Sequence, residues 1–174
     1  CISMSLLQVI PATSILSSPT VRCFFHKGTS TCSYIVECPK TKKAAIIDSV
    51  LDYALHSAKV STDYADEIVR EVEKEGLKVE WILETHVHAD HVTASAYLKK
   101  KLPGSKTAIS DRIVEVQTKW AEIFEWNDFD CSGAQWDKLI SSQTVLEIGE
   151  LKLTALPTPG HTPACTTFVV GDSL

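Results

Sequence analysis

A dense histidine motif follows directly after an apolar run and limits what this chain can be. The motif reads THVHADH from Thr85 to His91, and the segment Val79 to Leu83 precedes it. An apolar run of this length predicts a buried strand, so the motif should form the loop at the end of that strand. Neutral imidazole and carboxylate groups suit zinc and iron, and we therefore interpret the cluster as a metal site.

A second histidine-bearing segment, TPGHTP at 158–163, lies far downstream and places His161 on a separate loop that could reach the same ion. Gly160 has no Cβ, so we expect the backbone beside His161 to approach a ligand or metal closely. The predicted metal ligands are His86, His88, Asp90, His91 and His161, and Asp90 is also the candidate catalytic residue.

Local geometry supports this interpretation. If residues 85–89 are extended, His86 and His88 project to the same side, and Asp90 and His91 follow at the start of a helix predicted from Val92. Two alternatives concern single residues: Asp90 could instead cap that helix, and His88 could be a core histidine. Three histidines and an aspartate at this spacing favour metal binding over either alternative. His26 and His56 receive no role.

Composition describes an ordinary globular chain. Its 174 residues, 44% of them hydrophobic, are enough for about one domain with a real core. The net charge of −5 and the pI near 5.7 give no electrostatic signature of nucleic-acid binding. No window approaches about 18 uninterrupted apolar residues, so we expect no membrane span. The six cysteines form no CxxC pair and are interpreted as reduced thiols.

The first 20 residues are interpreted as a disordered tail or the remnant of a transit peptide. Residues 1–22 are rich in Ser, Thr and Pro and contain no acidic residue, as is typical of transit peptides. Transit peptides are usually Arg-rich as well, whereas this segment contains only Arg22. The chain begins with Cys1 rather than Met, which suggests that it starts within a longer protein. The predicted location is mitochondrial or cytoplasmic.

Strands and helices alternate after this segment. Helical spacing of Tyr64, Ile68, Val69 and Val72 predicts a helix that starts at Thr62 or Asp63 and stops at Gly76. Further helices are expected over 92–101 and 111–124, the latter with Ile113, Val116, Trp120 and Ile123 inward. The four tryptophans are expected in the core. The expected strands are 21–26, 33–38, 44–48, 79–83, 106–109, 145–148, 151–156 and 166–170.

The two histidine motifs together resemble those of the metallo-β-lactamase superfamily. The segment VEWILET at 79–85, Asp48 after Ile46-Ile47, and HTPAC at 161–165 are similar to its persulfide dioxygenase and glyoxalase II-like branch. The similarity runs from about Val21 to the last residue. It implies an α/β fold of the αβ/βα metallo-β-lactamase-type sandwich, in one partial domain over 21–174.

The resemblance also implies a reaction. In the dioxygenase branch His86 and His161 would bind a mononuclear ferrous iron, Fe(2+), together with an aspartate. The enzyme would oxidise a glutathione-type persulfide to sulfite with O2, so the expected partner is a small thiol or persulfide. His88, Asp90 and His91 would then lie around the iron or bind a second ion. A homodimer is the assembly that we consider.

The chain departs from the family pattern at the third ligand. The family aspartate is expected roughly ~20 residues past the histidine of the PGH motif, beyond Leu174, because a return strand at about 3.3 Å per residue needs that length. Asp172 is interpreted as a turn residue that points away from the metal. The domain is therefore expected to be C-terminally incomplete.

Two other functions stay open. A zinc-dependent thioester hydrolase of glyoxalase II type would bind one Zn(2+) with His86, His88 and His161 and another with Asp90 and His91, and would use a bridging hydroxide. A metal-binding or inactive fragment is the third hypothesis, because the expected carboxylate is missing.

Overall fold

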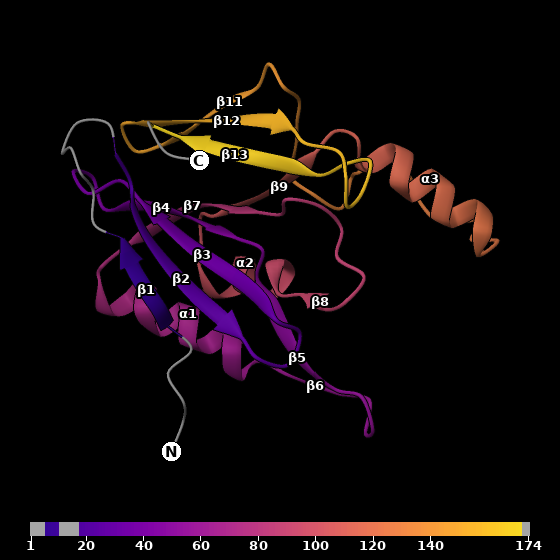
Figure 1. Cartoon of the computed structure of the whole chain (residues 1–174), viewed down its shortest axis with the longest axis horizontal. Helices are drawn as coiled ribbons and strands as arrows, with labels where there is room; N and C mark the ends of the chain where they lie inside the picture. The colour runs from indigo at the N-terminus through magenta and orange to yellow at the C-terminus, as the bar shows by residue number, and fades with distance from the viewer. Residues whose placement is uncertain (1–5, 11–17, 172–174) are drawn as a thin grey trace.

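A mixed β-sheet forms the centre of the computed structural model, which describes residues 6–10 and 18–171 (Figure 1). Within these residues its order is β1-β2-β3-β4-β7-β9-β10. The strands are β1 (Leu6–Ile10), β2 (Thr20–His26), β3 (Thr31–Glu37), β4 (Lys43–Ile47), β7 (Lys78–Leu83), β9 (Lys106–Ser110) and β10 (Lys138–Ile140).

One half of the sheet is antiparallel. Strands β2, β3 and β4, all three expected from the sequence, form an antiparallel meander, and β1 pairs with β2 at the edge. Residues 6–10 therefore form a strand where the sequence suggested a tail, because β2 offers them an open edge. The neighbouring residues 1–5 and 11–17 lie outside the described part of the chain.

The other half is parallel and determines where a site can form. Strands β4, β7, β9 and β10 all run in one direction. Helix α1 (Asp63–Lys74) precedes β7, and α2 (Ser95–Lys101) precedes β9. In such a sheet the loops at the carboxyl ends of the strands gather at one edge, where ligands usually bind. The histidine motif leaves β7 at this edge.

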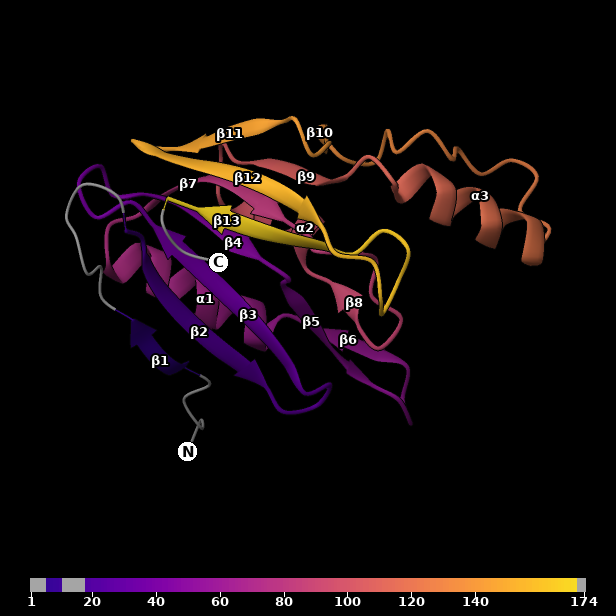
Figure 2. The ribbon, with the colours of Figure 1, turned by 45° about the horizontal axis from the view of Figure 1, so that its top comes forward.

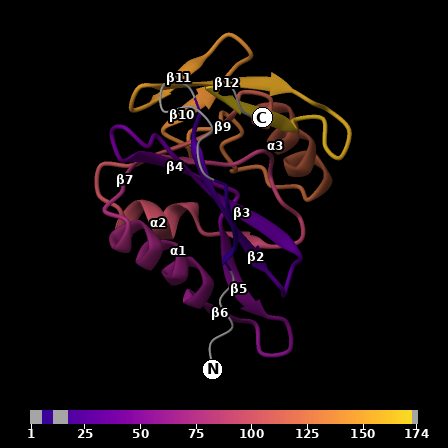
Figure 3. The ribbon, with the colours of Figure 1, turned by 60° about the vertical axis from the view of Figure 1, so that its left-hand side comes forward.

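Two further layers enclose the sheet. Helices α1 and α2 cover one face, and the small sheet of β11 (Val145–Ile148), β12 (Leu151–Pro157) and β13 (Thr166–Val170) covers part of the other (Figures 1 and 3). Strands β5 (Val50–Ala54), β6 (Lys59–Ser61) and β8 (Val92–Thr93) form a separate ribbon near the edge that carries the motif (Figure 2). The predicted layered α/β architecture is confirmed.

Strand β4 belongs to two hydrophobic cores. Ala44 and Ile46 pack under the helices, whereas Ala45 and Ile47 face the small sheet. All four side chains are buried because successive residues of a strand point to opposite faces and both faces are covered. The buried stripe of α1, with Tyr64, Ile68, Val69 and Val72, completes the first core as predicted.

The predicted helix 92–101 begins later than expected, at Ser95. Val92 and Thr93 instead form β8 and pair with Leu51 and Val50 of β5. β-branched residues fit a pleated strand, and β5 provides an edge to pair with, so tertiary context outweighs the helical pattern here. The alternative that Asp90 caps this helix is therefore wrong, because the residue before Ser95 is Ala94.

Helix α3 (Ile113–Ile123) extends away from the body of the molecule (Figure 1). Only Ile113 and Gln117 of this helix are buried, whereas Trp120 and Ile123 are 46% and 55% exposed, contrary to their predicted inward position. The prediction that the tryptophans lie in the core is wrong for Trp120 and Trp126. Their rings stack instead on either side of Phe124, at centroid distances of 5.4 and 5.1 Å.

Among residues 6–10 and 18–171, no helix combines the length and apolar character needed to cross a membrane. The cysteines of the described ranges, Cys23, Cys32, Cys38, Cys131 and Cys165, carry free thiols.

A buried ion pair joins the antiparallel strands to helix α1. Arg22 and Glu37 are 5% and 2% exposed, and Nη1 of Arg22 lies 2.6 Å from Oε2 of Glu37. Nη2 of Arg22 also contacts Oε2 of Glu75 on the helix side at 2.9 Å, and Nζ of Lys42 contacts Glu37 at 2.7 Å. Burial alone would raise the pKa of Glu37, but the hydrogen bonds from Lys42 and Arg22 outweigh it and lower the pKa below 4.5.

Replacing Glu37 by Gln should reduce the free energy of unfolding by about 1.5–3 kcal/mol at neutral pH, because Arg22 loses a charged hydrogen-bond partner but keeps Glu71 and Glu75. The stabilisation from a lowered folded pKa is present above the unfolded value of 4.5 and is lost as pH falls through the folded value. Urea unfolding at a series of pH values should show this loss in the wild type and less of it in Glu37→Gln.

The matched control is Glu150→Gln, which breaks the exposed pair with Lys40 and should cost less than about 1 kcal/mol. Equal costs for the two variants would contradict the importance of the buried pair.

Candidate metal centre

Asp48 fixes the start of the histidine motif. It follows β4 with a φ of +52°, and its carboxylate accepts two hydrogen bonds from Thr85, which follows the neighbouring strand β7. The backbone N–H of Thr85 donates to Oδ1 and the hydroxyl donates to Oδ2, each at 2.7 Å. Thr85 is thereby held at the carboxyl ends of two adjacent parallel strands.

The four predicted imidazoles form one continuous cluster. The ring centroids of His86 and His88 lie 4.0 Å apart, and those of His88 and His91 lie 4.2 Å apart. The ring of His161 meets that of His86 edge-on at 5.0 Å. The structure therefore brings together the two loops that the sequence predicted to share a site, and His86 and His88 lie on the same side of the chain.

Backbone contacts bring the distant loop to the motif. The N–H of Thr166, at the start of β13, donates to the carbonyl of Thr85 at 3.0 Å. Within the loop, the N–H of Thr158 donates to the carbonyl of Cys165, and the N–H of Thr162 donates to Sγ of Cys165. A Cβ at Gly160 would meet no protein atom within 4 Å, so the protein's own packing does not require a glycine there, and close approach to a ligand or metal stays a prediction. Loop closure at Cys165 positions His161.

His86 is a neutral ligand candidate. The Thr85 hydroxyl donates its single proton to Asp48. Nδ1 of His86 therefore donates to the Thr85 hydroxyl oxygen, at 2.9 Å. Burial lowers the pKa of His86, and the neighbouring His88 lowers it further. The ring therefore keeps a lone pair on Nε2 at neutral pH.

His88 has a different electrostatic environment. Its Nε2 lies 3.2 Å from Oδ1 of Asp48 and 3.5 Å from Oε2 of Glu84, and its Nδ1 lies 4.0 Å from Asp90. Burial alone would lower the pKa of His88, but hydrogen bonds to Asp48 and Glu84 outweigh it and raise the pKa to about 10. The two carboxylates thus favour the imidazolium form.

Glu84 lies beneath the cluster and is 2% exposed. Its Oε1 accepts hydrogen bonds from the hydroxyls of Thr93 and Ser95, which fixes the segment leading into α2. Burial raises the pKa of Glu84, and the nearby Asp48 carboxylate adds to that effect. The ligand atoms of Asp48, Glu84 and His88 also lie within 4.8 Å of one another. Both oxygens of Asp48 and Oε1 of Glu84 accept hydrogen bonds, whereas Oε2 of Glu84 has no hydrogen-bond partner and lies 3.5 Å from Nε2 of His88.

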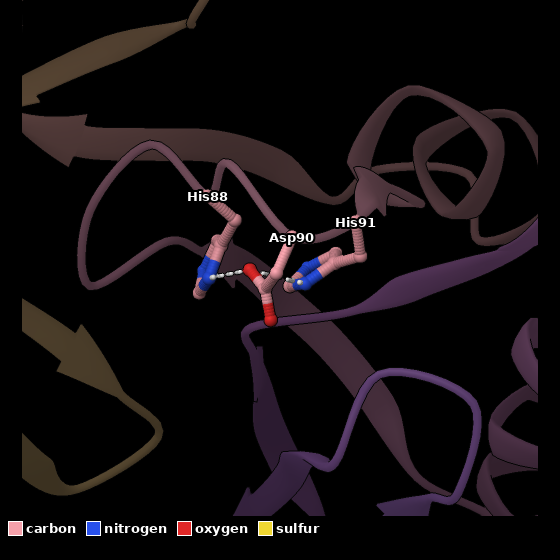
Figure 4. A group of neighbouring side chains, drawn as sticks. All are labelled: His88, Asp90 and His91. Carbon is pink, nitrogen blue, oxygen red and sulfur yellow. Dashed lines mark ion pairs between the residues drawn. The ribbon is translucent and has the colours of Figure 1, made fainter.

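Asp90 and His91 form the outer part of the cluster, where the Asp90 carboxylate lies between the rings of His88 and His91 (Figure 4). Oδ1 of Asp90 is 3.4 Å from Nδ1 of His91, and the Asp90 side chain is 57% exposed whereas that of His91 is fully buried. Burial lowers the pKa of His91, as does the charge of His88. Burial would raise the pKa of Asp90, but its backbone hydrogen bond and the two histidines lower it.

The donor set fits a metal ion. Nε2 of His91 is buried without a hydrogen-bond partner, which is unusual for a polar atom unless an ion or ligand satisfies it. Ligand atoms of His88, Asp90 and His91 lie within 4.8 Å of one another, and His86 and His161 adjoin this group. Imidazole nitrogens together with a carboxylate are suitable ligands for zinc or iron.

Several residues that shape the site were not assigned a role from the sequence. Asp48 and Glu84 were noted only as part of the family resemblance, and Thr85 only as the first residue of the motif. The signal for Asp48 was its position directly after an apolar strand, since polar residues at such strand ends often reach a site. Nothing in the sequence pointed to Thr31, whose hydroxyl lies 3.4 Å from Nδ1 of His91. Asp172 lies outside the described residues.

A cavity of about 510 Å³ lies elsewhere, between the turn after β2 and the β5–β6 ribbon. His26, Asp52 and Tyr64 are part of its wall, and it includes none of the predicted metal ligands.

Comparison with known proteins decides the family. The sequence profile of the Metallo-beta-lactamase superfamily matches residues 27–174. The chain belongs to this superfamily. The predicted fold is therefore confirmed, as is the resemblance on which it was based.

The similar proteins carry different names. The "Beta-lactamase hydrolase-like protein" of Xylella fastidiosa is 44% identical over 158 residues, which cover 91% of this chain and 36% of the relative. "Glyoxylase B2" of Dictyostelium discoideum is 41% identical, covering 75% of this chain and 45% of the relative. "Persulfide dioxygenase ETHE1, mitochondrial" of Homo sapiens is 30% identical, covering 87% and 48%. The chain thus spans half or less of the length of these relatives.

A solved superfamily structure agrees with the fold. The crystal structure of ETHE1 from Myxococcus xanthus matches with a TM-score of 0.63 and 25% identity, over 87% of this chain and 54% of that one. The superfamily and the donor set both support a metal site at the cluster.

Asp48→Asn should lower the pKa of His88 in the metal-free protein, because the substitution removes the carboxylate closest to its Nε2. A raised folded pKa stabilises the protein fully below the unfolded value of 6.5, and that contribution is lost as pH rises through about 10. NMR titration of the His88 ring should show the shift. Asp128→Asn, the same change in an exposed loop, is the control, and an unchanged His88 titration in Asp48→Asn would contradict the assignment.

Proposed function

We propose that this domain belongs to a persulfide dioxygenase-like enzyme of sulfur metabolism, which oxidises a glutathione-type persulfide to sulfite and the free thiol with O2. His86 and His161 would hold a single Fe(2+). The observation that carries this proposal is the contrast among the clustered rings. Burial lowers the pKa of His86, whose ring meets that of His161, whereas Nε2 of His88 lies 3.2 and 3.5 Å from two carboxylates that favour its imidazolium form.

Two imidazoles on one side of an iron leave coordination positions for a carboxylate, for O2 and for the substrate sulfur, and this is the chemistry that the ion supplies when bound. The chain's own residues do the positioning. Asp48 and Thr85 fix His86 through its Nδ1, and Cys165 and Thr166 hold the loop of His161. Asp90, which is exposed at the rim, is proposed to face the substrate.

The relationship to the human persulfide dioxygenase and the fold similarity to the Myxococcus protein support this choice. The third ligand is proposed to be an aspartate that lies beyond Leu174. The proposed partner is accordingly a small thiol or persulfide rather than a macromolecule.

A zinc-dependent thioester hydrolase is the second candidate. The observation in its favour is that His88, Asp90 and His91 bring ligand atoms within 4.8 Å of one another beside His86 and His161, as two-metal hydrolysis would need. The relative named "Glyoxylase B2" agrees with this alternative.

Metal content and oxygen uptake distinguish the two candidates. The protein carrying this domain should contain one iron per chain and consume O2 with glutathione persulfide. Two zinc ions per chain together with cleavage of a glutathione thioester would replace the dioxygenase proposal by the hydrolase.

His86→Ala and His161→Ala should each reduce iron to less than about a tenth of the wild-type content, because a two-histidine site cannot lose one imidazole and keep its ion. Elemental analysis after iron loading is the measurement. His56→Ala, in the exposed turn between β5 and β6, is the matched control and should retain full loading. Full iron content in His161→Ala would show that the distant loop does not bind the iron.

A further inference from the structure

A chain of hydrogen bonds links the cavity wall to the metal cluster through residues that have no assigned role. We propose that His26, Thr29 and Thr31 form a positioning relay that holds His91 as its Nδ1–H tautomer, so that the lone pair of Nε2 faces the site as an acceptor. The proposal rests on the proposed function only in that His91 borders the metal and substrate position.

The links of this relay are continuous. Oδ1 of Asp52 lies 3.2 Å from Nε2 of His26, and Nδ1 of His26 lies 2.8 Å from the hydroxyl of Thr29. The hydroxyls of Thr29 and Thr31 are 2.8 Å apart. The hydroxyl of Thr31 then lies 3.4 Å from Nδ1 of His91. The relay thus crosses from β5 through the β2–β3 turn to the motif.

The number of protons on each group determines which atom donates at each hydrogen bond of the relay. Asp52 accepts, so Nε2 of His26 donates to it, and whenever the ring carries a single proton its Nδ1 accepts from Thr29. Because the Thr29 hydroxyl donates its only proton to His26, it accepts a hydrogen bond from Thr31. Thr31 also lies 3.5 Å from Asp90, a longer contact than the 2.8 Å to Thr29, so its proton goes to Thr29. Its free lone pairs then face Nδ1–H of His91.

The start of the relay is rigid. His26 is 8% exposed, and its ring packs edge-on against Tyr64 with the centroids 4.8 Å apart. The other carboxylate oxygen of Asp52 accepts the backbone N–H of Tyr64 at 2.9 Å, at the first turn of α1. Gly28 closes over the ring, since a Cβ there would lie 2.9 Å from Cε1 of His26. These contacts leave His26 little freedom to turn.

The unpartnered atom at the other end agrees with this direction. Nε2 of His91 is buried and has no hydrogen-bond partner, which is the atom left as an acceptor when Nδ1 carries the proton. Partners of the second ring nitrogen commonly fix the tautomer of histidines at metal sites, and their loss typically costs about 10- to 100-fold in affinity or activity. The same logic applies here to a histidine beside the ion.

Long-range 1H–15N NMR of the metal-free protein tests the relay directly. At about pH 8, where imidazoles of ordinary pKa are neutral, His91 should be the Nδ1–H tautomer, assigned by its absence in His91→Asn. Thr31→Val keeps the size and β-branching of the residue but removes the hydroxyl. The Asp90 carboxylate, 3.4 Å away, is then the remaining acceptor beside Nδ1 of His91, and we expect a mixture of tautomers. Thr31→Ser should restore the wild-type pattern. His26→Gln, which breaks the relay at its far end, should also give a mixture.

A wild-type Nε2–H tautomer, or an unchanged His91 signal in Thr31→Val, would overturn the proposal. Activity adds an independent measurement: Thr31→Val should lower kcat for O2 uptake by about 10- to 100-fold with unchanged iron content, and Thr31→Ser should recover it. The tautomer is measured without metal or substrate, so a wild type that consumes no O2 would refute the proposed reaction and leave the relay to be judged on its NMR result.

Discussion

The carboxylate of Asp48 is the contact on which the site depends. It lies at the end of one parallel strand and accepts two hydrogen bonds from Thr85 at the end of the next, while also facing the ring of His88. One acidic side chain therefore sets the backbone position of the motif and the charge of a ring within it. Because Asp48 has a left-handed backbone conformation, its orientation is fixed by the turn as well as by its partners.

This arrangement divides the clustered histidines by their hydrogen bonds. His86 and His91 each use Nδ1 on a neighbouring side chain and keep Nε2 open, whereas His88 faces carboxylates with both ring nitrogens. Side chains of the same residue type thus lie in different electrostatic environments. The difference arises from their hydrogen-bond partners, among them Asp48, Thr85 and Thr31.

The sequence was sufficient for the parts of the structure that depend on local pattern. The apolar run before Thr85 predicted strand β7, and the spacing of Tyr64, Ile68 and Val72 predicted α1. The two histidine segments predicted that His86 and His161 would meet, because few arrangements explain both. Long-range pairing was less accessible: β8 depends on the edge of β5, and the exposure of Trp120 depends on α3 leaving the body of the fold. Nor could a sequence pattern place Thr31, which reaches His91 only after two distant strands align.

Strand β4 links the integrity of the core to that of the site. Its alternating side chains fill both hydrophobic layers, and Asp48 follows its last residue. A shift of one residue along the strand would send each apolar side chain to the opposite layer and move the carboxylate by about 3.3 Å, farther than a hydrogen bond to Thr85 can tolerate. The same strand therefore fixes both the packing of the core and the position of the site. An insertion or deletion anywhere within it would disturb the two together.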